Sequence, residues 1–216
     1  MKSALKFFYK SHRIGASTGK TLLWIWVRND LPKLTGDLGI DLAGGTMGNK
    51  RFFKTKEYIC VDINQSKLDI GIANNPDAKI INSRIQDFLL NENQKKPNLL
   101  VCLQTMGTNS YFEHDETLNV IKLMYRSLKE GGNMVFNIGK ESGDLNIIEK
   151  EIKIFFKKKF KSIQSKSYGV LHKTYQKPIP GFARLGLAYI MHLLPPLRTL
   201  FGSKKDKLYY CCKGKL

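Results

Sequence analysis

Five short apolar runs punctuate the middle of the chain, at residues 38–42, 58–62, 78–82, 98–103 and 133–138. Each run is too short for an ordinary helix, and the segments between the runs are polar or carry apolar residues at helical spacing. Near-continuous apolar strands that alternate with amphipathic helices indicate a parallel sheet with both faces covered. We therefore predict an α/β fold of three layers, in which helices flank a doubly wound sheet and ligands bind at the carboxyl ends of its strands.

Helices and strands are also predicted around the fifth run. DETLNVIKLMYRSLK at 115–129 places its apolar residues roughly on one helical face, and the glycines of EGG end that helix. A helix through NIIEKEIKIFFKKK, a strand near residues 161–168 and a final short strand in KLYYCCKGK follow. The sheet therefore continues to the end of the sequence.

Composition limits the class of protein. The 216 residues, 42% of them hydrophobic, suit one globular domain with a full-sized core. The four cysteines, Cys60, Cys102, Cys211 and Cys212, show no C-x-x-C pairing, so neither a disulfide framework nor a zinc site is expected. The sequence has no signal-peptide pattern and no apolar run of the roughly 18 to 20 residues that span a bilayer. We expect a cytoplasmic protein that is at most peripheral at the inner membrane face.

The net charge of +18 is unevenly distributed. Residues 1–36 contribute +6, residues 37–149 contribute −2 and residues 150–216 contribute +14. Basic ends around a nearly neutral middle fit an anionic partner, such as nucleic acid, a phosphorylated small molecule or a lipid headgroup. They fit a solvated basic surface equally well.

The stretch GIDLAGGTMGN at 39–49 ends the first run on an acid and continues into a glycine-rich turn. From Ala43 onward it matches the dinucleotide pattern G-x-G-x-x-G, with alanine in place of the first glycine. Counted from Asp41, it also matches the D-x-G-x-G-x-G turn of S-adenosylmethionine enzymes, with Ala43 and Met47 at two of the glycine positions. The stretch by itself leaves both interpretations open.

Polar residues follow the next two runs as well. Asp62 ends the second run, 21 residues after Asp41, where a carboxylate can accept hydrogen bonds from both ribose hydroxyls of a nucleoside. Gln86 and Asp87 follow the third run, where an adenine ring could lie. Three such features in order are stronger than any one of them, and they predict a nucleoside-containing ligand.

From about Gly39 to Ile138 the chain resembles the class I S-adenosylmethionine-dependent methyltransferases. GIDLAGGTMGN is similar to the first motif of that family, YICVDINQSKLDIG to its second-strand acid, RIQDF to its adenine contact and NLLVCLQT to its fourth-strand motif. LMYRSLKEGGNMVFNI is the most specific segment, since dinucleotide dehydrogenases do not usually show it. KLYYCCKGK resembles the family's antiparallel last strand, so the resemblance implies seven strands, mostly parallel, with the last one antiparallel.

The resemblance also implies S-adenosylmethionine as the cofactor, with its amino-acid portion in the glycine turn. Met47 stands where the family has glycine, so that either the pocket narrows or the loop shifts and Gly48 serves instead. No metal is expected, because the sulfonium is itself the activated group. The implied cofactor-binding residues are Asp41, Ala43, Gly44, Gly45, Thr46, Gly48, Asp62, Ile63, Gln86, Asp87 and Gln104.

His114, just past the fourth strand, is the candidate catalytic residue, as a general base that deprotonates the acceptor. The alternative is a loop residue beside a helix N-terminus, with Asp115 as the helix cap. We favour the alternative, because methyl transfer gains mostly from the alignment of donor and acceptor. Glu113 and Tyr111 are weaker candidates for the same role.

We therefore predict a methyltransferase that acts on an oxygen or nitrogen of a small-molecule or lipid-linked acceptor, such as a glycan intermediate. RNA fits almost as well, and an anionic membrane surface is a further expected partner; the sequence does not give the oligomeric state. An NAD-dependent oxidoreductase built on the same turn would have to account for the LKEGG segment. A nucleotide-fold module without catalysis is the remaining alternative, which Met47 keeps open.

The predicted organisation is a basic helical extension at 1–36 followed by a methyltransferase domain at 37–216. An insertion at 169–204, before the last strand, is expected to pack on the core, to cap the acceptor site or to lie on a membrane. TLLWIWVR at 21–28 offers the same choice. GASTGKT at 15–21 is one residue short of a phosphate loop, so we predict a loop that opens the helix after it.

Overall fold

The computed structural model describes residues 14, 17–107, 112–169, 180–197 and 206–216. The chain divides into two compact units. The first unit comprises residues 1–30 and 167–207, and the second comprises residues 31–166 and 208–216. The extension and insertion boundaries that the sequence suggests, 1–36 and 169–204, stay predictions.

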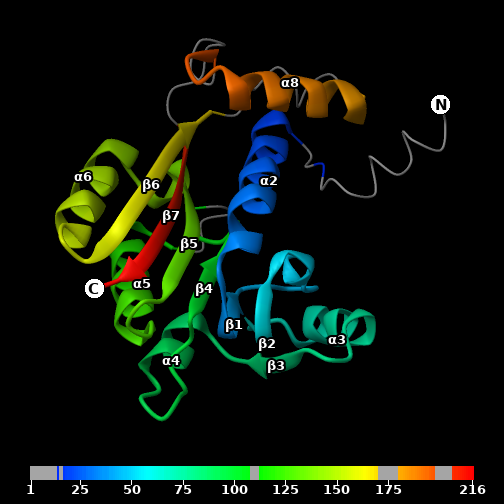
Figure 1. Cartoon of the computed structure of the whole chain (residues 1–216), viewed down its shortest axis with the longest axis vertical. Helices are drawn as coiled ribbons and strands as arrows, with labels where there is room; N and C mark the ends of the chain where they lie inside the picture. The colour runs from blue at the N-terminus through cyan, green and yellow to red at the C-terminus, as the bar shows by residue number, and fades with distance from the viewer. Residues whose placement is uncertain (1–13, 15–16, 108–111, 170–179, 198–205) are drawn as a thin grey trace. The chain divides into compact units, whose positions relative to one another are not determined.

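The second unit contains almost all of a seven-stranded sheet (Figure 1). The strand order is β3-β2-β1-β4-β5-β7-β6. Strands β1 to β5 pair with one another in parallel. The strands are β1 (Thr35–Leu42), β2 (Lys54–Asp62), β3 (Lys79–Asn82), β4 (Leu99–Cys102), β5 (Asn133–Gly139), β6 (Phe160–Tyr168) and β7 (Lys207–Lys215).

The last strand is antiparallel, as its backbone hydrogen bonds show. Gly131 donates to the Lys215 carbonyl at 2.8 Å, and Lys215 donates to the Gly132 carbonyl at 2.9 Å, so the end of β7 lies beside the start of β5. The Lys215 ammonium also donates to the carbonyls of Tyr125 and Leu128, and so caps the carboxyl end of the helix His114–Ser127. The predicted fold class, a mostly parallel seven-stranded sheet with an antiparallel last strand, is confirmed.

Helices cover both faces of this sheet. The inward side chains of α4, α5 and α6 join alternate residues of β1, β4, β5 and β7 in one core cluster, as the period of two along a strand requires. Helix α3 packs against β2 and β3. The helices of this unit are α3 (Gln65–Asn74), α4 (Ile85–Leu90), α5 (His114–Ser127) and α6 (Leu145–Phe156), with 3₁₀ turns at Leu31–Lys33, Lys50–Phe52 and Lys140–Ser142.

Two strands begin earlier than their apolar runs suggest. In the parallel register of β1 and β2, Thr35 is paired with Lys54 and Leu38 with Glu57. Lys54 and Glu57 are charged, so no apolar run marks this part of β2, although its backbone pairs with β1. The apolar runs therefore mark only the buried ends of these strands.

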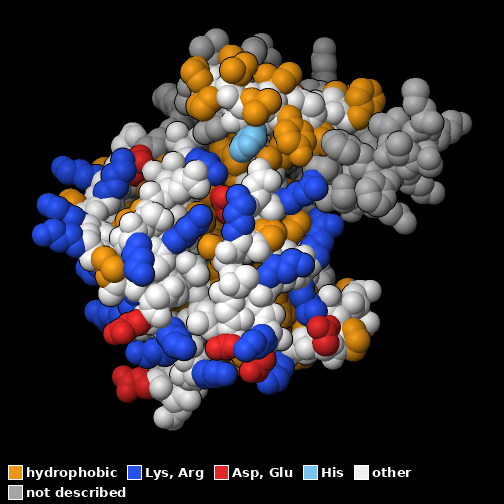
Figure 2. All heavy atoms as spheres, in the orientation of Figure 1, with side chains coloured by type: hydrophobic (Ala, Val, Ile, Leu, Met, Phe, Trp, Pro, Cys, Tyr) orange, Lys and Arg blue, Asp and Glu red, His pale blue; other side chains and the backbone are white. Residues whose placement is uncertain are grey.

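The first unit contains helices α2 (Thr18–Asp30) and α8 (Gly181–Leu193). The indole N–H of Trp26 donates to Nδ1 of His192 at 3.0 Å, which joins the two helices. Helix α8 buries Leu185, Ala188 and Met191, while hydrophobic side chains on its other side gather at the surface (Figure 2). These exposed side chains are Phe182, Ile190, Leu193 and, just after the helix, Leu194.

All four cysteines are buried and free. Burial raises the pKa of the Cys102 thiol to about 12, so it stays protonated at neutral pH. Within the residues that the structure describes, none of the helices has the length and apolar character needed to cross a membrane.

Candidate functional site

A cavity of about 420 Å³ lies where the carboxyl ends of β1, β2, β3 and β4 meet. Parallel strands bring these ends to one edge of the sheet, so residues far apart in the sequence become neighbours. The cavity is lined by Ala43, Asp62, Ile63, Asn64, Lys67, Ser83, Arg84, Ile85, Gln104, Thr105 and Phe112.

The turn after β1 forms one wall of the cavity. Ala43, Gly45 and Met47 all take positive φ angles, 53°, 54° and 58°, so the chain coils tightly as soon as the strand ends. Gly44 must be glycine for a different reason. A Cβ there would lie 2.7 Å from the Cys60 sulfur and 2.8 Å from an Asp41 carboxylate oxygen.

Asp62 is the acid that faces the cavity. Its Oδ2 accepts the Gly45 N–H at 2.9 Å, and its Oδ1 accepts the Asn64 N–H at 2.8 Å. These bonds fix the carboxylate and bind the β1 turn to the end of β2. Each carboxylate oxygen can accept about two hydrogen bonds, so each retains capacity for a ligand hydroxyl.

Asp41 has a different environment from Asp62, although both acids lie at the carboxyl end of an apolar strand. Its side chain is fully buried, and its Oδ2 accepts the Tyr58 hydroxyl at 2.9 Å and the Asn49 amide at 3.1 Å. Burial and the Asp41 charge raise the pKa of Tyr58 far above its ordinary value, so the phenol stays protonated and donates. Asp41 thus supports the floor of the turn and is not among the cavity-lining residues.

Met47 does not narrow the cavity. Its side chain is buried against α3, where a Cβ on Gly71 would come within 2.9 Å of the Met47 Cε. The positive φ of Met47 directs the chain so that this side chain packs against the helix. Gly71 provides the space that a larger residue would fill.

The fourth strand contributes Gln104 and Thr105. Gln104 has a φ of 63°, and its N–H donates to Oδ1 of Asn137 at 2.7 Å. Asn137 is fully buried on β5, so the neighbouring strand holds this strained turn in place. Phe112 also lines the cavity.

The residues that line the cavity after the third strand differ from those predicted. Ser83, Arg84 and Ile85 line the cavity, whereas Gln86 and Asp87 do not. Helix α4 begins at Ile85, so the next two side chains turn away with the helical rotation, and Asp87 is exposed. The short β3–α4 connection was the available signal, because residues between a strand end and a helix start lie at the sheet edge.

The predicted set is therefore divided by the structure. The predicted residues that line the cavity are Ala43, Asp62, Ile63 and Gln104. Gly45 does not line it, but its N–H holds the Asp62 carboxylate. The cavity-lining residues that no sequence pattern singled out are Asn64, Lys67, Ser83, Arg84, Ile85, Thr105 and Phe112. The remaining predicted residues, which are not cavity-lining, are Asp41, Gly44, Thr46, Gly48, Gln86 and Asp87.

His114 is the first residue of α5 and does not line the cavity. Its Nε2 lies 3.1 Å from Oε2 of Glu151 on α6. The helix cap is Glu113 and not Asp115, so that part of the prediction is wrong. Tyr111 lies outside the described residues.

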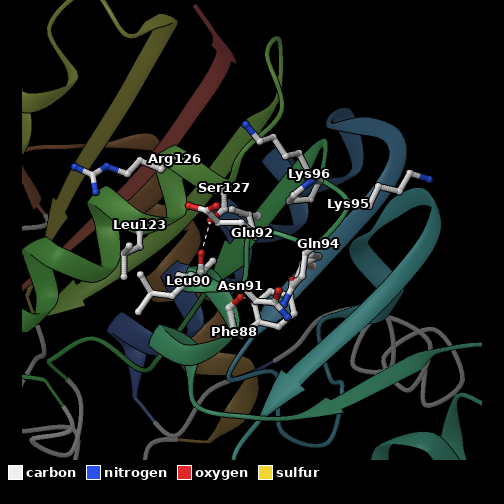
Figure 3. A pocket seen from close by; sticks show the side chains of 14 residues that line it. Phe88, Leu90, Asn91, Glu92, Gln94, Lys95, Lys96, Leu123, Arg126 and Ser127 are labelled. Atoms are coloured by element: carbon white, nitrogen blue, oxygen red, sulfur yellow. Dashed lines mark hydrogen bonds between the residues drawn. The ribbon is translucent and has the colours of Figure 1, made fainter.

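A second cavity, of about 390 Å³, lies near the amino ends of the strands, between the α4–β4 connection and α5 (Figure 3). Pro97 and Leu100 line it at the start of β4. Lys95, Lys96 and Arg126 extend away from its interior in Figure 3, so no cationic groups converge there. Among the described residues, no group of three or more His, Cys, Asp or Glu side chains is placed to hold a metal ion.

No protein-family model matches the sequence, and no curated protein does. Solved structures do match the fold. A methyltransferase candidate from Streptococcus mutans, in complex with SAH (S-adenosylhomocysteine), aligns with a TM-score of 0.56 at 12% identity over 89% of this chain and 97% of its own. The N-methyltransferase NodS from Bradyrhizobium japonicum WM9 aligns at 0.54 and 10% over 90% and 93%. An rRNA methylase from Streptococcus thermophilus aligns at 0.52 and 12% over 88% and 95%.

Proposed function

Because the chain has the fold of the class I S-adenosylmethionine-dependent methyltransferases, we propose that it transfers a methyl group from S-adenosylmethionine to an oxygen or nitrogen acceptor. One observation carries the proposal: the Asp62 carboxylate is fixed by two backbone N–H groups and still faces a cavity at the strand ends. The residues around it fit a nucleoside with a charged amino-acid tail.

Each part of the cavity has a place in this proposal. Asp62 accepts the ribose hydroxyls, while Ile63 and Ile85 provide apolar contacts for a purine ring. Ala43 allows the ligand to approach the turn closely, since its side chain is only a methyl group. The Lys67 stem lies beside Gly45, so its ammonium group is available to a carboxylate at the turn.

Methyl transfer requires little more from the protein than alignment. When bound, S-adenosylmethionine supplies an electrophilic methyl group on a sulfonium. Gln104, Thr105 and Phe112 then hold the acceptor atom in line with that methyl group and exclude water from the fourth-strand side of the cavity. The proton of the acceptor leaves to solvent or to a polar group of the acceptor itself.

The acceptor in this proposal is a small-molecule or lipid-linked compound. Phe112, an aromatic residue in the lining of the cavity, supports an acceptor with an apolar portion. RNA is the alternative, which the net charge of +18 also suits.

Calorimetry of the full chain with S-adenosylhomocysteine, NAD and NADP tests the proposal. We expect binding of S-adenosylhomocysteine alone, with a stoichiometry of one. Preferential binding of NAD or NADP would favour an oxidoreductase, and binding of none of the three would favour a module that has lost catalysis.

His114→Ala is expected to change the rate of methyl transfer less than about tenfold, whereas loss of a general base typically costs roughly 10² to 10⁴. The reason is that His114 is engaged with Glu151 away from the cavity. Initial rates at saturating cofactor and acceptor check this, measured from about pH 5.5 to about pH 8.5, a range that contains the ordinary histidine value near 6.5. A hundredfold loss with unchanged cofactor affinity would instead assign His114 to catalysis.

A further inference from the structure

One edge of the sheet is covered by a basic surface that the proposed function does not use. It consists of the outer side of α6 and the start of β6, and Lys and Arg side chains gather there on the left of Figure 2. Helix α6 buries Leu145, Ile148, Ile152 and Phe156 and turns its remaining residues outward. We define the α6–β6 face by its exposed residues, Ile147, Lys150, Lys153, Ile154, Lys157, Lys158, Lys161 and Ile163.

Three isoleucines are exposed among these lysines. Ile147 is 50% exposed, Ile154 is 65% exposed and Ile163 is 42% exposed. Ile147 and Ile154 are seven residues apart, close to two helical turns, so they share one side of α6. Contiguous exposed apolar patches rimmed by polar side chains mark protein–protein or membrane interaction sites.

The face is continuous from the helix to the strand. One hollow of about 400 Å³ is lined by Lys150, Lys153, Ile154 and Lys157, together with Asn146 and Glu149. A second hollow of about 290 Å³ lies between α6 and β6 and shares Lys153 and Lys157 with the first. Ile163 lines this second hollow, so the apolar and basic groups belong to one surface.

Most of the positive charge on this face is not neutralised. Glu149 pairs with Lys153 at 2.9 Å. Within the described part of the chain, Lys150, Lys157, Lys158 and Lys161 form no ion pair. Excess positive charge of this kind attracts phosphate groups at an anionic surface.

The second hollow also contains hydroxyl donors. Ser162 and Ser165 line it, and so does Tyr210, which is 1% exposed. The Tyr210 hydroxyl is buried and has no hydrogen-bond partner among the described residues. A phosphate oxygen that entered the hollow would meet the exposed hydroxyls of Ser162 and Ser165 together with the nearby lysines.

We propose that the α6–β6 face docks on an anionic membrane surface, with its lysines at the headgroup phosphates and its isoleucines at the boundary of the acyl chains. Surfaces for single-stranded nucleic acid combine positive charge with aromatic side chains on which bases stack. This face instead carries lysines and isoleucines, with no arginine and no exposed aromatic side chain. Peripheral membrane surfaces combine these two residue classes, lysine for anionic lipids and aliphatic groups for insertion.

Co-sedimentation of the full chain with phosphatidylcholine vesicles, with and without phosphatidylglycerol, tests the proposal without any cofactor. We expect binding only to the anionic vesicles. Lys157→Gln, Lys158→Gln and Lys161→Gln together should lower the partition coefficient by about tenfold to a hundredfold, because each basic residue near the surface adds attraction. The matched control is Lys54→Gln, Lys96→Gln and Lys129→Gln, three exposed lysines at the amino end of the sheet, which should stay within about twofold of the parent because they lie outside the face.

Ile147→Ser with Ile154→Ser separates insertion from charge, since it leaves the net charge unchanged. We expect at least about a fivefold loss of vesicle binding from the lost apolar insertion, with an unchanged melting temperature because both side chains are exposed. Leu193→Ser with Leu194→Ser changes the exposed end of α8 as a comparison. Vesicle binding that survives the isoleucine variant, or that only the α8 variant abolishes, overturns the proposal. So does a filter-binding result in which structured RNA binds tightly and vesicles do not.

Discussion

Asp62→Ala should lower the affinity for S-adenosylhomocysteine by about tenfold to a hundredfold, since hydrogen bonds to a charged group contribute roughly 1.5 to 3 kcal/mol each before water compensates. The same substitution should also lower the stability of the ligand-free protein. Asp62 also accepts the N–H groups of Gly45 and Asn64, so the variant loses one bond that joins the β1 turn to β2 and one that orders the start of the β2–α3 connection. We therefore expect the free energy of unfolding of the ligand-free protein to fall by about 1 to 2 kcal/mol.

Calorimetry with S-adenosylhomocysteine and thermal unfolding of the ligand-free variant measure the two effects separately. Asp69→Ala is the matched control, because Asp69 is an exposed acid on α3 that does not line the cavity. It removes the same charge a short distance away and should leave the affinity within about twofold, as expected for a screened surface group. If Asp62→Ala bound the ligand as tightly as the parent protein does, the proposed orientation of the nucleoside would be wrong.

Asp41→Ala should destabilise the fold by about 3 kcal/mol, because it removes a buried acceptor from two donors. Those donors are the Tyr58 hydroxyl at 2.9 Å and the Asn49 amide at 3.1 Å, and the Asp41 side chain is fully buried. For a chain of this size the melting temperature should fall by about 6 to 12 °C. The substitution also removes support from beneath the turn that carries Gly44.

Tyr58→Phe is the graded companion to Asp41→Ala, since it removes one of the two donors and retains the ring. It should cost about 1 kcal/mol, the typical net value of one hydrogen bond. Denaturant unfolding of both variants, followed by circular dichroism, provides the comparison. Equal stability of Asp41→Ala and the parent protein would show that the buried carboxylate does not support the turn.

The sequence determined the sheet because parallel strands are encoded locally. Each buried strand is a short apolar run, and the order of runs and amphipathic helices restricts the chain to few topologies. KLYYCCKGK was predicted as the last strand, and β7 spans Lys207–Lys215. The end of α5 was not predicted correctly: the helix ends at Ser127 with Leu128 as its C-cap, so Gly131, with a φ of 72°, lies in the turn beyond it.

Only the tertiary structure distinguished the two acids at the ends of the first two strands. Asp41 and Asp62 are both aspartates at the carboxyl end of an apolar run, Asp41 as the last residue but one of β1 and Asp62 as the last residue of β2. Tyr58 and Asn49 surround Asp41, while Asp62 meets backbone N–H groups at the rim of the cavity. Tyr58 comes from the neighbouring strand and Gly45 from the turn after β1, 17 residues from their partners, so no local pattern contains these contacts.

Side-chain direction was likewise decided by contacts distant in sequence. Met47 packs against Gly71 on α3, so a residue that suggested a narrowed pocket instead stabilises the turn from behind. His114 meets Glu151, which is 37 residues away on α6. The physical reason is the same in both cases: a residue type and its spacing limit what a side chain can do, but the direction in which it points depends on which element folding brings against it.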